Sequence, residues 1–350
     1  MMKRMVVFLL LVFVTGLFCG SGIASEKPVK LKFAYYTQPT TLAGQCAQFV
    51  KEEIEQATDG KVKIDIFWGG SLLKGPEILQ GVKDGTVEMG HINPNYYPSE
   101  LAMSGAYATL PQGPSSFKGQ DLLFGNIFNK VPELKDELLR HNQIPLFAYT
   151  VLPKCLVSTK PVTSLDDLKG RKIRAANRWV LSQLEAVGAI PVSVAWSDCY
   201  MALQTGTIDA VFTNLDSIHS TKLDEVAPHI FLAKPLWSGS KFMITVNADT
   251  WNSFPKETQD MIMDAMSIVS KKYANLFEST WDEVVKEQIE MGCVVNNMSD
   301  EDVKRWVNMP IHEELQNIWI KEQEGKGISN ATKIFAQIKD AVQEAIEVEK

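Results

Sequence analysis

The sequence predicts an α/β protein of two lobes that are tied together by one long helix. Three observations support this fold class. Strand-like and helix-like segments alternate between residues 29 and 92, an order typical of α/β domains with a largely parallel sheet. A second alternating series begins after Thr150. The third observation is an apolar stripe of helical period from Met261 to Ile289, which is too long for one domain of ordinary size.

The first series begins with alternating apolar and charged residues, which predict a strand with one buried face. A helix with apolar residues at helical spacing follows, and Asp59-Gly60 ends it. The predicted elements are strands at 29–35, 61–67 and 87–92, with helices at 41–57 and near 76–82.

The second series contains shorter strands and two recognisable helix starts. Residues 164–167 have the spacing of a capping box, and Ser197 can cap the helix that carries Tyr200. The predicted strands lie near 155–158, 172–175, 191–194, 208–213, 230–233 and 242–246, with a further helix at about 179–187.

The C-terminal third is predicted to be helical. A helix of about 33 residues would be roughly 50 Å long, so we expect it to run along both lobes. Two further helices are expected at 303–321, where Pro310 should kink or split the helix, and at 331–348.

The N-terminus has the pattern of a secretory signal peptide. Lys3 and Arg4 precede an apolar run, and Gly22-Ile23-Ala24 resembles a cleavage signal. Cys19 leaves a lipoprotein as an alternative. We therefore divide the chain into a signal peptide (1–25), an N-terminal lobe (26–151 plus 240–280) and a C-terminal lobe with the last helices (152–239 plus 281–350).

Composition and cysteine spacing exclude several classes of function. The 350 residues carry a net charge of −7 and no basic patch, which argues against nucleic-acid binding.

Four cysteines remain after cleavage, and none forms a C-x-x-C pair. Four buried thiols are favoured over a disulfide, which export would also permit.

The motifs of common enzymes are absent. The sequence contains no G-x-S-x-G, G-x-G-x-x-G, Walker or H-E-x-x-H motif. After His312-Glu313-Glu314, Gln316 stands where a second histidine would be needed. We expect no catalytic activity, no metal and no cofactor; a secreted enzyme on the same scaffold is the less favoured alternative.

Residues 154–231 resemble the extracytoplasmic solute-binding proteins of tripartite ATP-independent periplasmic (TRAP) transporters. The matching segments are SLDDLKGRKIR (164–174), VGAIPV (187–192) and AWSDCYMALQTGTIDA (195–210), with a looser match at KDGTVE (83–88). The resemblance implies a two-lobed periplasmic binding protein fold, class II-like, with a long helix spanning both lobes. The ligand would lie in the cleft, and the lobes would close over it.

The resemblance also implies that Arg174 binds a ligand carboxylate. A guanidinium offers two parallel N–H donors that match the two carboxylate oxygens. The alternative is an exposed arginine at a strand end. Lys154 stands where many relatives have a second arginine, and it carries the charge without the planar fork.

Further residues correspond to cleft positions of the family. They occur at strand ends, where ligands bind in open α/β sheets, or as aromatic walls whose alternative role is core packing. These candidates are Tyr36, Asn93, Trp196, Thr213, Asn214 and Trp237, followed with less support by Asn177 and Trp179.

Three potential aromatic walls and a single guanidinium fork favour an aromatic or hydrophobic monocarboxylate as the ligand. A sugar acid is the second choice and a dicarboxylate the third. We expect a periplasmic monomer that delivers its ligand to membrane-embedded TRAP transporter subunits. A sensor that presents the ligand to a receptor is the alternative.

Overall fold

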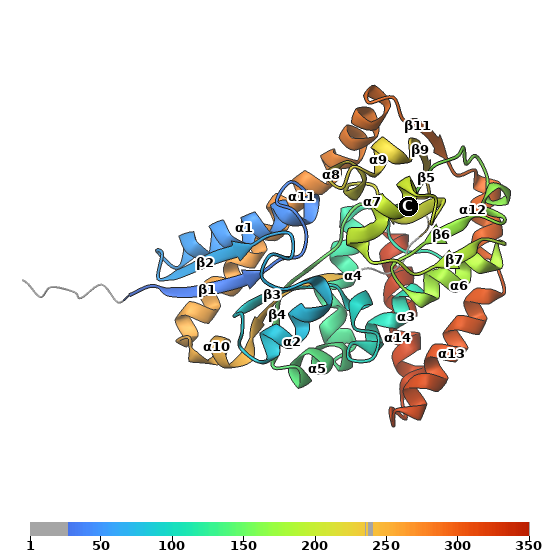
Figure 1. The fold of residues 1–350 in the computed structure, drawn as a ribbon. Helices are drawn as coiled ribbons and strands as arrows, with labels where there is room; N and C mark the ends of the chain where they lie inside the picture. The colour runs from blue at the N-terminus through green and yellow to red at the C-terminus, as the bar shows by residue number, and fades with distance from the viewer. Residues whose placement is uncertain (1–26, 235, 237–240, 350) are drawn as a thin grey trace, which may run out of the picture.

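The computed structural model describes residues 27–234, 236 and 241–349 (Figure 1). The predicted signal peptide (1–25) and Trp237 lie outside the described residues. The described chain folds into two α/β lobes, one around each of two sheets.

The first lobe contains a five-stranded sheet of order β2-β1-β3-β10-β4. Strands β1, β2 and β3 are parallel, whereas β10 is antiparallel to both of its neighbours. The sheet is therefore parallel except for one strand, which returns from the other lobe. Its strands are β1 (Val29–Ala34), β2 (Val62–Phe67), β3 (Met89–Ile92), β4 (Gln143–Tyr149) and β10 (Phe242–Asn247).

Helices of the first lobe follow the expected order, with several additions between residues 93 and 142 and one more, α10, after β10. Thr41 caps α1 by accepting a hydrogen bond from the Gly44 backbone. The helical elements are α1 (Leu42–Ala57), η1 (Gly75–Glu77), α2 (Ile78–Lys83), η2 (Pro94–Tyr96), η3 (Ala102–Ser104), α3 (Gly105–Ala108), α4 (Phe117–Lys130), α5 (Glu133–Arg140) and α10 (Ala248–Ser253).

The second lobe contains a six-stranded sheet of order β11-β9-β5-β8-β6-β7. Strand β5 is antiparallel to both of its neighbours, and the remaining pairs are parallel. The strands are β5 (Lys154–Ser158), β6 (Lys172–Arg174), β7 (Ile190–Val192), β8 (Ala210–Asn214), β9 (His229–Leu232) and β11 (Val294–Asn297).

Short helices connect the strands of the second lobe. The capping box that was predicted at Ser164 and Asp167 is present at the start of η4. These elements are η4 (Leu165–Leu168), α6 (Arg178–Ala186), η5 (Trp196–Asp198), α7 (Cys199–Gln204), α8 (Ser217–Ser220), α9 (Leu223–Val226) and α12 (Asp300–Val307).

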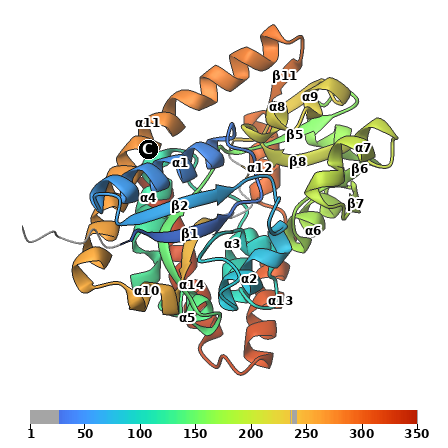
Figure 2. The same ribbon diagram turned by 60° about the vertical axis from the view of Figure 1, so that its left-hand side comes forward.

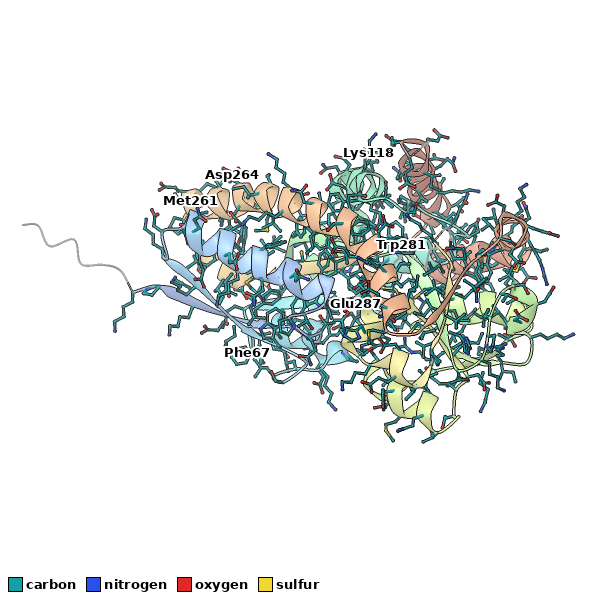
Figure 3. The ribbon with its side chains drawn as sticks, turned by 90° about the horizontal axis from the view of Figure 1, so that it is seen from above. Phe67, Lys118, Met261, Asp264, Trp281 and Glu287 are labelled. Carbon is teal, nitrogen blue, oxygen red and sulfur yellow. The ribbon has the colours of Figure 1, made fainter. Side chains whose placement is uncertain are left out.

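The long helix α11 (Lys256–Glu290) has 35 residues, which corresponds to about 52 Å. It packs against α1 in the first lobe and ends beside β11 of the second lobe (Figure 2). In Figure 3 the helix runs from Met261, beside α1, to Glu287, near the second lobe. The prediction of a long helix that spans both lobes is therefore confirmed.

The C-terminal helices differ from the expected division of the chain. The predicted helix at 303–321 is split at Pro310 into α12 and α13 (Ile311–Gly325). Helix α14 (Ala331–Glu347) packs mainly against α4 of the first lobe, although residues 281–350 were grouped with the second lobe. The cause is apolar burial, because Ile334, Ile338 and Val342 join the cluster that also contains residues of α3 and α4.

All four cysteines of the described chain are buried and free, as favoured from the sequence. Within the same residues, no three His, Cys, Asp or Glu side chains are grouped so that they could hold a metal ion. Nor does any described helix combine the length and the apolar character that a bilayer crossing requires.

Candidate functional site

Three polar residues of the second sheet lie close together at the strand ends that face the first lobe. Arg174 ends β6 and Asn214 ends the neighbouring parallel strand β8. Lys154 begins β5, which is antiparallel to β8 and pairs Lys154 with Asn214. The sheet topology therefore brings one guanidinium, one ammonium and one amide together.

Arg174 is buried, with 5% of its surface exposed. Its Nε donates to the carbonyl oxygen of Val194 at 3.0 Å, and its guanidinium carbon lies 5.5 Å from the Trp196 ring centroid. No hydrogen-bond partner of Nη1 or Nη2 occurs among the described residues. The local contacts thus orient the side chain and leave its two terminal donors for another group.

Lys154 is also buried, on the other side of β8 from Arg174. Its Nζ donates to Asn214 Oδ1. Burial lowers the pKa of Lys154 to about 8, and the positive charge of Arg174 acts in the same direction. Asp216 opposes this shift, and burial raises the pKa of the Asp216 carboxyl to about 7.

The first lobe contributes a stack of rings. The His91 ring is stacked between Tyr35, at a centroid distance of 4.1 Å, and Tyr36, at 4.6 Å. Its Nε2 lies 2.8 Å from the Tyr149 hydroxyl, and burial lowers the pKa of His91 to about 3. The imidazole is therefore neutral near pH 7, and this wall of the site is uncharged.

Asn93 and Tyr96 complete the wall from the first lobe. Asn93 follows β3 and accepts a hydrogen bond from the Asn95 backbone, which starts η2. Tyr96 packs edge-on against Tyr36, with ring centroids 5.4 Å apart. Burial raises the pKa of the Tyr96 hydroxyl, so it acts as a neutral donor.

These side chains enclose a cavity of about 280 Å³ between the two lobes. That volume is close to the lower limit of roughly 300–1,000 Å³ for small-molecule sites. Seven of the expected site residues line it: Tyr36, Asn93, Lys154, Arg174, Trp196, Thr213 and Asn214.

Two expected residues lie elsewhere. Asn177 caps α6 by accepting from the Val180 backbone, and its amide donates to Asn95 Oδ1 at 3.1 Å. Trp179 is buried in an apolar cluster with Trp319. Both residues line a second groove and not the cavity, because α6 begins directly after Asn177 and turns its first residues toward α3 and α13. The expectation that they face the ligand is not supported by this arrangement.

Several cavity residues were not singled out from the sequence. The aromatic ones are Tyr96, Tyr200, Phe212, Phe242 and His91, and the charged one is Asp216. Asp216 follows the expected end of a strand by only a few residues, so the strand-end rule could have identified it. The rings carried no comparable signal, since apolar and aromatic residues at such positions are more often core residues.

Two α/β lobes around a cavity that contains a buried arginine define a protein of the solute-binding class. The family model of bacterial extracellular solute-binding proteins, family 7, matches residues 33–322. The chain belongs to this family, and it is a TRAP transporter solute-binding protein. The family is one of transport proteins and not of enzymes.

Relatives of known ligand are similar over most of their length. The C4-dicarboxylate-binding periplasmic protein DctP of Rhodobacter capsulatus is 26% identical over 307 residues, covering 83% of this chain and 88% of the relative. A TRAP solute-binding protein of Rhodoferax ferrireducens, solved with copurified benzoate, has a TM-score of 0.81 at 16% identity and covers 92% of this chain and 100% of that one. DctP7 of Bordetella pertussis, which binds pyroglutamic acid, has a TM-score of 0.76 at 20% identity and covers 90% and 99%. At these identities the solved structures establish the two-lobed fold.

Proposed function

We propose that the chain is the periplasmic receptor of a TRAP transporter and captures a small organic monocarboxylate between its lobes. One observation carries this proposal. Arg174 is buried at the cavity wall, and its terminal nitrogens have no partner among the described residues, although its Nε is fixed by Val194. A buried arginine with unused donors matches an anionic ligand that supplies the acceptors.

A carboxylate would match the geometry of the Arg174 guanidinium. Two parallel N–H groups fit the two carboxylate oxygens, and lysine cannot reproduce that fork. Because Arg174 is buried, such a charge-assisted pair would be stronger here than at the surface. The Val194 and Trp196 contacts hold the guanidinium in place, so ordering it costs little when the ligand binds.

The cavity walls support an aromatic or hydrophobic body for this ligand. Rings from both lobes line the cavity, and stacking against them favours a flat apolar group. The rings are Tyr36 and Tyr96 from the first lobe and Trp196, Tyr200 and Phe212 from the second. The copurified benzoate of the Rhodoferax ferrireducens protein agrees with this ligand class.

A sugar acid is the second candidate. The side chains of Asn93, Thr213 and Asn214 line the same cavity and provide hydrogen-bonding groups for hydroxyls. Under this alternative Arg174 still binds the ligand carboxylate. The choice among ligands would then come from hydrogen bonds of the amides to hydroxyl groups and not from stacking on the rings.

Delivery to the membrane subunits requires that these subunits distinguish the loaded receptor from the empty one. Ligand contacts from both lobes would favour the closed form and thus shift the population toward it. Export through the predicted signal peptide would place the receptor in the periplasm, where the Rhodobacter capsulatus relative acts.

The test is a thermal-shift screen of aromatic acids, sugar acids and simple organic acids, followed by calorimetric titration of the best ligand. Arg174→Ala should lower the affinity by at least about 100-fold, because it removes a charge-assisted bidentate pair. The control is Arg140→Ala, which removes an exposed arginine at the end of α5 and should change the affinity by less than about twofold. Equal affinity in Arg174→Ala and the wild type would contradict the proposal.

A further inference from the structure

Asp216 lies two residues beyond the end of β8 and contributes to the wall of the cavity. Its side chain is 9% exposed, and its Oδ1 has no hydrogen-bond partner among the described residues. A buried carboxylate that is not fully hydrogen-bonded is unfavourable unless a positive charge lies nearby. Lys154 is the cation that acts on Asp216.

Lys154 is in turn compensated by groups of its own lobe. Its Nζ donates to Asn214 Oδ1, and Asp216 is the opposite charge whose field acts most strongly on it. Lys154 and Asp216 thus form a buried pair of opposite charges that act on each other without a direct ion pair among the described residues. Replacing either member alone would leave an uncompensated charge in a low-dielectric site.

Arg174 has no such compensation. It donates a hydrogen bond to the Val194 carbonyl and makes a cation–π contact with the Trp196 ring, and no described carboxylate forms an ion pair with it. Among the described residues, the charged ones of the cavity wall are therefore two cations, Arg174 and Lys154, and one anion, Asp216. With all three ionised, one positive charge remains.

We propose that Asp216 is a specificity-determining residue that restricts the ligand to a single carboxylate. By compensating Lys154 inside the protein, Asp216 leaves Arg174 as the only cation that a ligand needs to neutralise. This inference rests on the proposed function and adds to it a choice between acids that differ by one carboxylate.

The charge balance explains the direction of this choice. A monocarboxylate brings the cavity to neutrality. A second ligand carboxylate would leave one net negative charge in the cavity, where Asp216 would also repel it. Discrimination would then arise from a repulsive group in the protein and not from a missing attractive one.

The experiment uses acids that form matched pairs: benzoate and isophthalate, butyrate and succinate, glucuronate and glucarate. The ratio of the dicarboxylate Kd to the monocarboxylate Kd is measured by calorimetry at fixed ionic strength. Asp216→Asn keeps the shape of the side chain and raises the cavity charge by one. The ratio should therefore fall by at least about tenfold. An unchanged ratio in a variant of wild-type thermal stability would overturn the inference.

Two further variants keep the inference falsifiable if Asp216→Asn folds poorly. Lys154→Met lowers the cavity charge by one and should raise the ratio. Lys154→Met/Asp216→Asn removes both charges and should return the ratio to within about threefold of the wild type. A ratio that does not rise in Lys154→Met, or that shifts in the double variant, would equally contradict the role of Asp216.

The two proposals fail in different ways. If the wild type binds none of the acids, or if affinity does not depend on Arg174, the proposed function is wrong. If the wild type binds a monocarboxylate through Arg174 and the ratio does not respond to Asp216, only the role of Asp216 is wrong.

Discussion

The two lobes share an architecture but contribute different chemistry to the cavity. Each sheet has a single antiparallel strand, β10 in the first lobe and β5 in the second, and each of these strands follows a passage of the chain between the lobes. Both lobes supply rings and amides, but the three charged residues of the described lining, Arg174, Lys154 and Asp216, all come from the second lobe. We therefore expect the second lobe to set the charge of the ligand and the first lobe to contribute only to its shape.

The strongest test of this difference between the lobes replaces the guanidinium of Arg174 with an ammonium group, which keeps the positive charge. Arg174→Lys should lower the affinity for every carboxylate by roughly 10- to 100-fold, since lysine offers no parallel pair of donors. Arg305→Lys is the control, because Arg305 pairs with Asp166 at the surface of the same lobe. Calorimetry measures both. An affinity retained in Arg174→Lys would show that charge alone suffices.

A change in the first lobe should affect ligand choice more than affinity in general. Tyr36→Leu removes the ring that stacks on His91 and keeps an apolar side chain. The affinity for an aromatic acid should fall by about three- to tenfold, and that for an aliphatic acid of similar size should change less. An equal loss of affinity for both acids, measured by titration, would show that the first lobe contributes to ligand affinity in general.

The pH dependence of ligand affinity should originate in titratable groups of the second lobe. As the pH rises from 6 to 9, Asp216, with a pKa of about 7, gains a negative charge, and Lys154, with a pKa of about 8, loses a positive one. Each step lowers the cavity charge by one, so the affinity for an anion should fall by roughly tenfold in total. Titrations across this range with wild type and with Lys154→Met/Asp216→Asn measure the effect, and the double variant should give a nearly flat profile.

The other titratable groups of the site should not contribute between pH 6 and 9. Arginine remains charged. Burial keeps His91 neutral by lowering its pKa to about 3, and it raises the pKa values of Tyr35, Tyr36, Tyr96, Cys155 and Cys199. A rising affinity with pH would show that another group controls binding.

The smallest effect on affinity is expected outside the cavity. Asn177→Ala removes the cap of α6 and the hydrogen bond to Asn95. It should lower the free energy of unfolding by about 0.5–2 kcal/mol and change ligand affinity by less than about twofold. Denaturant unfolding and calorimetry separate the two effects. A large loss of affinity would return Asn177 to the ligand site, as the sequence had suggested.

Sequence patterns were sufficient for the elements that have strong local signals. The alternating strand at 29–35, the helix at 41–57 and the split at Pro310 follow from periodicity, capping and proline chemistry. Strand β4 was missed because its burial does not alternate in the manner of a half-buried strand. Helix α4 was missed in a segment that contains Gly119 and Gly125, which weaken helix propensity.

The site was predictable where strand ends defined it and not where packing did. The family resemblance pointed to Arg174, Asn214 and Lys154, which stand at the ends of strands, and the sheet register brings these strand ends together. The direction of Trp179 depends on how α6 packs against α3 and α13, which no local pattern encodes. The charge balance that includes Asp216 is likewise a property of three separate segments.

The length of α11 has a mechanical consequence. A continuous helix of 35 residues resists bending, and its first half is fixed against α1 by Ile262, Val269 and other buried residues. Its far end adjoins β11, an edge strand of the second sheet. We therefore expect the helix to act as a rigid spacer that opposes sliding of the lobes along its axis and leaves rotation as the easier motion. A rotation of this kind would open and close the cavity for the ligand while the residues of the two lobes that line it stay aligned.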